Sequence, residues 1–502
     1  MDMGLRTLEA YMIATPPIRR APSMHLDRAA TPLTVPLAAA VLILLAAPDL
    51  AAQTIRNPPK IWVDVCQRCH GDTGGNGSAQ SLLDDQWIGD GSNDWLFESI
   101  DKGVPDRGMP AYGETLTDEE IRALVIYIRE LRSQHERGGV EGGHVADHTR
   151  YESKLHDFTV TTVVDGLEIP WSMEVLPNGD WLVVERPGRL RLVAGGESLV
   201  DPPIADTPEV LAVGQGGLLE VKLHPDYEDN GWVYLAFSEP RTIDGRELAM
   251  TTVVRGRIDD HAWTEQQDIY RAKDEHFMRT RYHYGTRIAF DDDGYLFFPI
   301  GDRGRKQMAQ DLGRPNGKIH RLHDDGRVPD DNPFVDRSDA LPSIWSYGHR
   351  NPQGLDFHPA TGELWESEHG PRGGDEINRI EKGVNYGWPV ITYGMNYNGT
   401  PITDRTHAPG MAQPVTQWTP SIAVIGIDFY EGDRFPQWKH DLFVSSIASG
   451  NLRRLRVDGD DLIEDELLFN DQGRLRDVHA APDGYLYVLT TEGRILRLAP
   501  AQ

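Results

Sequence analysis

The chain has 502 residues, of which 39% are hydrophobic, and its formal net charge at pH 7 is −28. This length exceeds one typical core, so we expect at least two domains, and the composition is that of a globular protein rather than a disordered one. The excess of acidic residues argues against nucleic acid and anionic membrane surfaces as partners, because both attract basic patches.

The first 52 residues are typical of an export signal. Basic residues precede an apolar run at 33–47, and small residues follow it. This order predicts a secretory signal at 1–52 and a periplasmic location. Three alternatives stay open: twin-arginine export through Arg19 and Arg20, a start at Met24, and an uncleaved signal that anchors the chain to the membrane.

The only two cysteines of the chain lie in Cys66-Gln67-Arg68-Cys69-His70. A C-x-x-C-H run is typical of covalent haem attachment, in which both thiols join the haem and the histidine binds its iron. The alternatives are a redox C-x-x-C pair and half of a zinc site, but zinc would need two more soft ligands and there is no second cysteine pair. We therefore predict a haem c held by Cys66, Cys69 and His70.

A sixth ligand for this haem is expected some tens of residues later. Met109 lies in a segment rich in Gly and Pro at 103–110, which suits a tight loop that brings a thioether to iron. His135, His144 and His148 are the alternative ligands. We predict the axial pair His70 and Met109.

A helix closes this domain in our prediction. Thr117 is followed by three acidic residues, and apolar residues then recur at helical spacing from Ile121 to Leu131. We expect a small all-α cytochrome c domain at 53–135, followed by a glycine-rich linker at 136–150.

The region 151–502 has a different pattern, in which short apolar strands alternate with turns of Gly, Pro and Asp. One phrase recurs, a turn rich in Pro, Asp, Asn or Gly followed by a strand of aromatic and aliphatic residues. Six copies at roughly the spacing of propeller blades predict an all-β, six-bladed β-propeller of four-stranded blades. The copies begin at Leu176, His224, Asp291, His358, Gly432 and Pro482.

Clusters of polar residues interrupt this all-β region. They lie at 283–287 and 301–305, before and after one expected strand, and at 347–354, 368–378 and 385–389. Any one cluster can be explained as a turn or a blade-closing hydrogen bond. Together they offer a base, a carboxylate, cationic groups and hard oxygen ligands, which an oxidoreductase site needs.

The same segments resemble the soluble glucose and aldose sugar dehydrogenases that use pyrroloquinoline quinone (PQQ). The resemblance runs from about Asp157 to Leu498, and Tyr393-Gly394-Met395-Asn396-Tyr397 favours the aldose branch. That family has a six-bladed propeller, which the repeats predict independently. The matching stretches include Gln215–Leu219, the His283 segment, Gly301-Asp302, Gly348–Pro352, Gly370-Pro371, Asp375–Asn378 and Arg474–Asp477.

The resemblance implies the roles of the catalytic residues. His283 would be the general base that takes the proton of an anomeric hydroxyl while hydride passes to the quinone, and Asp302 would orient it. Arg350 and Asn351 would face the reactive quinone carbonyl, where Arg350 stabilises the developing negative charge.

The resemblance also implies how the cofactors are held. PQQ would be bound by Gln215, Tyr397, Arg474 and Arg476, the arginines suiting its carboxylates. Calcium would polarise the quinone and would take hard oxygen ligands. Its ligands would be the backbone oxygens of Gly370 and Pro371 and the neighbourhood of Glu376 and Tyr386.

The chain departs from the family at two places. A family lysine that lies against the quinone is replaced by Ala448, so PQQ binding would need a substitute charge. Some calcium ligands after Tyr386 are also replaced, at Thr392, Gly394 and Asn396.

These observations predict a quinohaemoprotein that oxidises an aldose to its lactone and passes electrons to the haem. The cytochrome would then reduce a periplasmic carrier or a terminal oxidase. Other alcohols and polyols stay open as substrates. The alternative functions are a calcium-dependent sugar lactonase and an electron-carrying binding module without the quinone.

Overall fold

The computed structural model describes residues 56–84, 86–136 and 148–501. The predicted signal at 1–52 and most of the predicted linker lie outside these residues. Glu136 is the last residue of helix α4 and strand β1 begins at Thr149, so both elements extend slightly into the predicted linker. Among the helices of these three ranges, none is long and apolar enough to cross a membrane.

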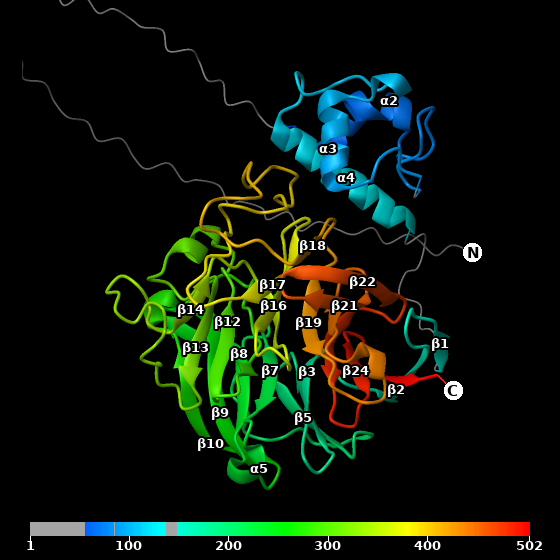
Figure 1. The fold of residues 1–502 in the computed structure, drawn as a ribbon. Helices are drawn as coiled ribbons and strands as arrows, with labels where there is room; N and C mark the ends of the chain where they lie inside the picture. Colours follow the sequence, from blue (N-terminus) through cyan, green and yellow to red (C-terminus); the bar gives the residue numbers. More distant parts are fainter. Residues whose placement is uncertain (1–55, 85, 137–147, 502) are drawn as a thin grey trace, which may run out of the picture. The chain divides into compact units, whose positions relative to one another are not determined.

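The N-terminal domain is built from helices, as predicted (Figure 1). Thr117 and Glu120 form a capping box at the start of the long helix, since each backbone N–H donates to the other side chain, at 3.2 and 3.3 Å. The helices are α1 (Pro58–Ile61), a π-helical turn (Trp62–Cys66), α2 (Gln67–His70), α3 (Asn93–Lys102), a 3₁₀ turn (Pro105–Arg107) and α4 (Asp118–Glu136).

The apolar face of α4 explains why this helix forms. Ile121 and Leu124 are fully buried, and with Val125 and Ile128 they pack in one core with residues of α1 and α3. The spacing of these residues is that of one helix face, so burying them stabilises the helix.

The rest of the described chain is a six-bladed β-propeller, which confirms the predicted fold class. Its first three sheets hold strands in chain order, and neighbouring strands are antiparallel. They are β3 (Pro170–Val175), β4 (Trp181–Glu185), β5 (Arg189–Ala194) and β6 (Ser198–Leu199); β7 (Leu218–Leu223), β8 (Val233–Ile243), β9 (Arg246–Asp259) and β10 (Ala262–Arg271); and β11 (Ala289–Phe290), β12 (Tyr295–Ile300), β13 (Lys318–His323) and β14 (Ile344–Tyr347).

The next two sheets follow the same order, and Figure 1 shows them from the yellow β16 to the orange β22. A short helix, α5 (Tyr227–Asn230), precedes β8 in the second sheet. These two sheets contain β15 (Pro352–Phe357), β16 (Leu364–Glu368), β17 (Asp375–Ile380) and β18 (Thr416–Trp418); and β19 (Val424–Phe429), β20 (Leu442–Ser446), β21 (Leu452–Asp458) and β22 (Asp461–Phe469).

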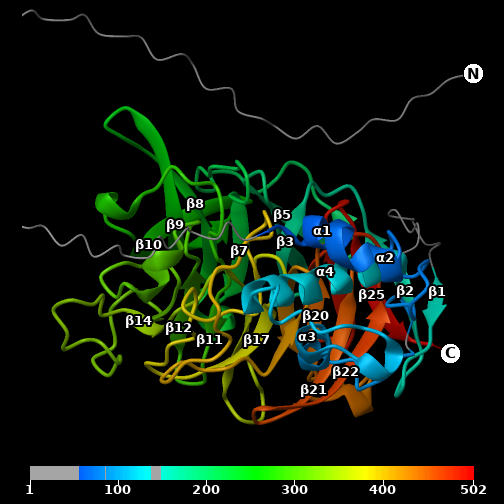
Figure 2. The same cartoon turned by 90° about the horizontal axis from the view of Figure 1, so that it is seen from above.

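The sixth sheet closes the ring by joining both ends of the domain. Strands β23 (Leu475–Ala480), β24 (Leu486–Thr490) and β25 (Ile495–Pro500) come from its C-terminus, and β2 (Phe158–Val164) comes from its start. Phe158 lies opposite Pro500, and Figure 2 shows β2 beside β25. Strand β1 (Thr149–Tyr151) adds to the outer side of β2.

The six recurring phrases fall at one structural position, the turn between the first and second strands of each sheet. In the first copy the Leu176 N–H donates to Asp180 O at 2.8 Å, and Gly179 has a φ of +87° that favours glycine. The aromatic and aliphatic residues that follow form the second strand, which is buried. The repeat is therefore the signature of a blade.

Side chains on the first strands connect neighbouring blades. Asp356 of β15 accepts from the Phe429 N–H of β19 at 2.9 Å, and Asp428 of β19 accepts from the Ala480 N–H of β23 at 2.8 Å. These two contacts join the fourth blade to the fifth and the fifth blade to the sixth.

Candidate active site

The helical domain holds a cavity of about 460 Å³ that brings together the predicted haem ligands. Cys66, Cys69, His70 and Met109 all line it. The remaining wall is largely apolar and includes Leu96, Ile100, Leu124 and Ile128. Because the π-helical turn leads directly into α2, both cysteines and the histidine lie on consecutive turns at this wall.

The chemistry of this cavity fits a covalently attached haem. Both cysteines are free, and burial, followed by the proximity of Cys69, raises the pKa of Cys66 to about 11. Nδ1 of His70 is buried without a hydrogen-bond partner, and burial lowers the pKa of His70, so its imidazole is neutral and able to bind iron.

The alternative axial ligands lie elsewhere. His135 is exposed in the last turn of α4, and Nδ1 of His148 lies 3.3 Å from Thr161 Oγ1. His144 lies outside the described residues. The structure thus places Met109, but neither His135 nor His148, at the cavity wall.

At the propeller, His283 and Asp302 form the central pair of the candidate site. His283 Nδ1 lies 2.6 Å from Asp302 Oδ1. The sequence interpretation placed one strand between these residues, which is wrong: β11 and β12 form an antiparallel hairpin there. The hairpin returns the chain to its starting end, and this brings Asp302 back beside His283.

Three further contacts fix this pair. Trp388 Nε1 donates to Asp302 Oδ2 at 2.8 Å, and the Gly304 N–H donates to Oδ1 at 2.7 Å. The His283 N–H donates to Gln215 Oε1 at 2.7 Å, and the φ of His283 is +50°. A left-handed backbone at a non-glycine residue is uncommon and has to be held by its surroundings.

The electrostatic surroundings keep His283 neutral. Burial and the positive charge of Arg350 lower its pKa, although Asp302 acts in the opposite direction. Burial alone would raise the pKa of Asp302, but the hydrogen bond and charge of His283, together with Arg350 and the Gly304 N–H, outweigh burial and lower this pKa. The His283 side chain is 14% exposed and that of Asp302 is 2% exposed, so the base is accessible and the acid is not.

Arg350 lies next to this pair. Its Nη1 donates to His369 O at 2.7 Å and to Gly370 O at 2.9 Å, and its guanidinium lies 5.5 Å from the ring centre of Trp388. Among the described residues, no carboxylate forms an ion pair with Arg350. Its Nη2 reaches Tyr397 Oη at 3.5 Å. The free positive charge suits an anionic oxygen.

Arg476 lines the neighbouring pocket of about 50 Å³, and the charges of Arg474 and Arg186 act on it. The Arg476 guanidinium lies 4.3 Å from the Trp171 ring centre, while burial and the charges of Arg474 and Arg186 lower its pKa to about 10. Gln215, Asn351 and His369 also line this pocket, as does Tyr284.

The polar atoms of this pocket fit PQQ, which carries several carboxylates. Tyr284 Oη and His369 Nε2 are buried and have no hydrogen-bond partner. Unpaired buried polar groups are costly, so a polar ligand would satisfy them. Ala448 is exposed and follows Ile447, a residue of the pocket wall. Arg186 lies close enough to Arg476 to add positive charge at this end of the channel.

Arg287, which follows the pocket residue Thr286, joins three blades next to the pocket. Its Nη1 donates to Glu220 Oε2 at 2.8 Å, its Nη2 lies 3.1 Å from Asp477 Oδ1, and its Nε donates to Gln353 O at 2.8 Å. This one guanidinium therefore contacts residues of β7, β15 and β23.

The predicted calcium ligands lie around one small cavity of about 10 Å³. Gly370, Glu376 and Tyr386 line it together with Glu368, and Pro371 directly follows Gly370. A carbonyl and two carboxylates are hard oxygen donors, which fit calcium. The phenol of Tyr386 is engaged elsewhere, since its Oη donates to Arg379 O at 2.6 Å, so only its backbone is available as a ligand.

Several residues of the site had no predicted role. Trp388 belongs to a segment that the sequence indicated, but its contact with Asp302 spans 86 residues and no local motif shows it. Trp171 and Arg186 lie at the ends of β3 and β4 in segments without any motif. Only their place at the ends of strands could have indicated these two residues, because the ends of propeller strands meet at one face of the propeller.

The comparisons with known proteins agree with this geometry. Residues 167–497 match the family described as Glucose / Sorbosone dehydrogenase, and residues 53–128 match Cytochrome C oxidase, cbb3-type, subunit III. The chain therefore belongs to the glucose/sorbosone dehydrogenase family and carries a cytochrome domain at its N-terminal side. This confirms the resemblance that the sequence motifs indicated.

Individual relatives match the propeller along nearly their whole length. Aldose sugar dehydrogenase YliI of Escherichia coli is 43% identical over 68% of this chain and 92% of its own. The apo-form crystal structure of the soluble aldose sugar dehydrogenase from Escherichia coli has a TM-score of 0.65 at 42% identity and covers 68% of this chain and 100% of that one. The PQQ-bound form of the aldose sugar dehydrogenase from Streptomyces coelicolor has a TM-score of 0.56 at 28% identity, over 68% and 98%.

The cavity of the helical domain predicts the axial ligand of the haem. Met109→Ala should remove the weak sulfur-to-iron band at the red edge of the visible spectrum, because the thioether at the cavity wall is lost. Absorption spectra of the oxidised protein test this, with His135→Ala as the control that keeps the band. A band that survives Met109→Ala would show that another residue ligates the iron.

The charges around His283 predict how its pKa responds to substitution. In the wild type the pKa should lie below the usual 6.5, since burial and Arg350 both disfavour the imidazolium. Arg350→Met removes a repelling charge and should raise it, whereas Asp302→Asn removes a stabilising charge and should lower it. NMR titration of the His283 imidazole measures this pKa in the wild type and in both variants. A lower pKa of His283 in Arg350→Met than in the wild type would contradict the assigned geometry.

Proposed function

We propose that this chain is a periplasmic quinohaemoprotein dehydrogenase that oxidises an aldose at its anomeric carbon to the lactone. The observation that carries the proposal is the accessible His283, paired with Asp302 and adjacent to the unpaired cation of Arg350. The same chain places a C-x-x-C-H motif and a methionine around a haem-sized cavity. Sugar dehydrogenase relatives support the substrate class.

His283 has the geometry of a general base. Its Nδ1 faces Asp302, so the proton resides there and Nε2 is left free to accept the proton of the anomeric hydroxyl. Trp388 and Gly304 satisfy both oxygens of Asp302, which keeps the carboxylate aligned with the imidazole ring. The low pKa of His283 leaves the base neutral at and above pH 7.

The surrounding residues would hold the quinone. Arg476 lines the pocket with Gln215 and Asn351, and Arg474, whose charge acts on Arg476, would join it in binding the carboxylates. Arg350 would face the oxygen on which negative charge develops. PQQ supplies, when bound, a two-electron acceptor for the hydride that leaves the anomeric carbon. Arg186 is our candidate for the charge that Ala448 does not provide.

Calcium would complete the propeller site. Its ligands would be the Gly370 and Pro371 backbone oxygens and the neighbourhood of Glu376 and Tyr386, and a bound calcium supplies Lewis-acid polarisation. Arg350 Nη1 donates to Gly370 O at 2.9 Å, so this carbonyl would connect the calcium site to the guanidinium that faces the quinone.

The cytochrome domain would take the electrons onward. A haem c supplies one-electron transfer, and a covalent tether raises its effective concentration at the propeller to about the millimolar range for a short flexible linker. Cys66, Cys69, His70 and Met109 would hold this haem. The next acceptor would be a periplasmic cytochrome or an oxidase, and an uncleaved signal would attach the protein to the membrane.

Sugar-dependent reduction of the haem tests the proposal. Full-length protein loaded with haem, PQQ and calcium should reduce its own haem when an aldose from a panel is added. His283→Gln should lower kcat/KM roughly 10²–10⁴-fold, because it removes the general base. His261→Gln, in the turn between β9 and β10, is the matched control and should leave the rate unchanged.

Two results would contradict the proposal. One is the absence of haem reduction by any aldose in fully loaded protein. The other is hydrolysis of a sugar lactone by the quinone-free protein without redox activity, which would make the chain a hydrolase.

A further inference from the structure

One face of the β16–β17 hairpin carries three carboxylates in a row of cross-strand pairs. Glu366 lies opposite Asn378 and Glu368 lies opposite Glu376 in the register of these strands. Like charges directly opposite each other destabilise a sheet. Either a bound cation or shared protons would neutralise this face.

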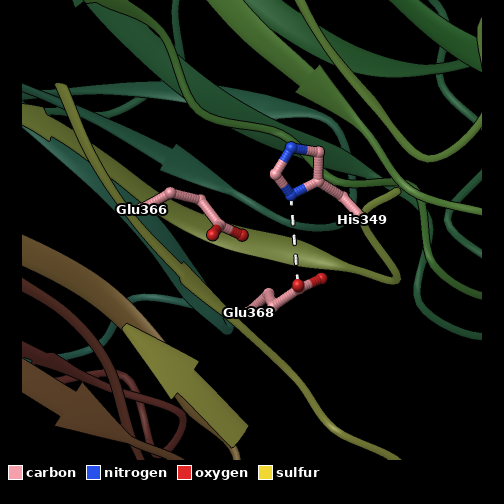
Figure 3. A group of neighbouring side chains, drawn as sticks. All are labelled: His349, Glu366 and Glu368. Atoms are coloured by element: carbon pink, nitrogen blue, oxygen red, sulfur yellow. Dashed lines mark ion pairs between the residues drawn. The ribbon is translucent and has the colours of Figure 1, made fainter. Parts of the chain in front are cut away.

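A histidine from the preceding connection points at the same face. His349 lies between β14 and β15, and Figure 3 shows its ring next to the carboxyl groups of Glu366 and Glu368. Its Nδ1 has no hydrogen-bond partner and lies 3.9 Å from Glu368 Oε1. Its Nε2 lies 2.9 Å from Ser346 Oγ, a contact outside the cluster that fixes the ring.

The cluster is buried and lacks a matching positive charge. His349 and Glu366 are fully buried and Glu368 is 4% exposed. Among the described residues, no lysine or arginine forms an ion pair with either glutamate. Lys318, the nearest buried ammonium, donates to the backbone oxygens of Met308, Ala309 and Asn316 instead.

Each acidic side chain also keeps an oxygen for a ligand. Asn378 donates to Glu366 Oε2 at 3.1 Å, but Glu366 Oε1 is buried without a partner. Glu368 Oε2 accepts the backbone N–H groups of Arg350 and Asn351, at 2.6 and 3.3 Å, and Oε1 faces His349. Glu368 also forms a side-chain hydrogen bond with Glu376. One nitrogen and two oxygens thus converge, with all ligand atoms within 4.8 Å of one another.

We propose that His349, Glu366 and Glu368 bind a divalent transition-metal ion of the zinc or manganese class. Zinc takes one imidazole and two carboxylates at about 2.1 Å, often with a water in the fourth position. Ligand atoms around such an ion lie about 3.4 Å apart. Side-chain rotations that move each ligand atom by roughly 1 Å would therefore close the site. His349 Nδ1, which is buried without a hydrogen-bond partner, is the nitrogen placed to bind the ion.

This site shares Glu368 with the cavity predicted to hold calcium, but its other ligands, His349 and Glu366, lie outside that cavity. Calcium prefers oxygen donors only, and its predicted ligands are Gly370, Pro371, Glu376 and Tyr386. The imidazole of His349 favours a transition metal. The bound ion would also brace the loop of Arg350, because Glu368 holds the backbone of Arg350 and Asn351 with its second oxygen.

The probe for this site is Zn²⁺ alone. Untagged, full-length, haem-loaded protein is stripped of divalent ions with a chelator, and the loaded haem keeps Cys66 and Cys69 from binding zinc. Calorimetric titration should show one Zn²⁺ per chain at this site, and the propeller should unfold at a higher temperature once the ion is bound. Neither readout involves PQQ or a sugar, so the result is independent of the proposed function.

Two variants make the outcome specific. Glu366→Gln should weaken Zn²⁺ binding at least ~100-fold, since a ligand and its charge are lost. It should also lose the rise in unfolding temperature that Zn²⁺ causes in the wild type, whereas a merely structural role for Glu366 would leave that rise intact. Glu363→Gln, a half-buried residue that pairs with Arg379, is the control and should change neither.

The opposing results are equally clear. Stripped wild-type protein that binds neither Zn²⁺ nor Mn²⁺ would overturn the proposal, and shared protons would then neutralise the glutamates. Equal Zn²⁺ affinity in Glu366→Gln and the wild type would overturn it as well, since the ion would lie elsewhere.

Discussion

The propeller site depends on one buried guanidinium, that of Arg287. It pairs with Glu220 and Asp477 and donates to the backbone of Gln353, so it ties blades together that are distant in the sequence. Removing one partner from a buried, hydrogen-bonded ion pair is strongly destabilising. The contacts of Arg287 therefore hold the first strands at fixed spacing, and the pocket above them keeps its shape.

The reactive side chains of the propeller site are placed by the ends of its strands and by the connections between them. The β11–β12 hairpin brings His283 and Asp302 to the same end of one blade, while the connection from β14 to β15 brings Arg350 from the next. The base is accessible, its carboxylate partner is enclosed, and the cation has no ion-pair partner among the described residues. A rigid ring of blades thus presents a base and a positive charge to one ligand, which suits transfer of a proton and a hydride from a sugar.

The sequence predicted the features whose signal is local. C-x-x-C-H is contained in five residues, and each blade turn needs the same Asp, Asn or Gly followed by a buried strand, so both domains and the six blades could be predicted. Contacts that span many residues could not. Trp388 reaches Asp302 across 86 residues, and His349 meets Glu366 only because β16 packs against the neighbouring connection. The single strand expected between His283 and Asp302 was wrong because two short strands and their turn fill that interval.

The most direct test of the account is the fate of the hydrogen on the anomeric carbon. Fully loaded protein is given an aldose that carries deuterium at this carbon, and haem reduction is followed together with the mass of the product. We predict that every oxidised sugar loses its deuterium while the haem becomes reduced, and that His283→Gln suppresses both events together. A product that retains the deuterium while the haem is reduced would contradict oxidation at the anomeric carbon.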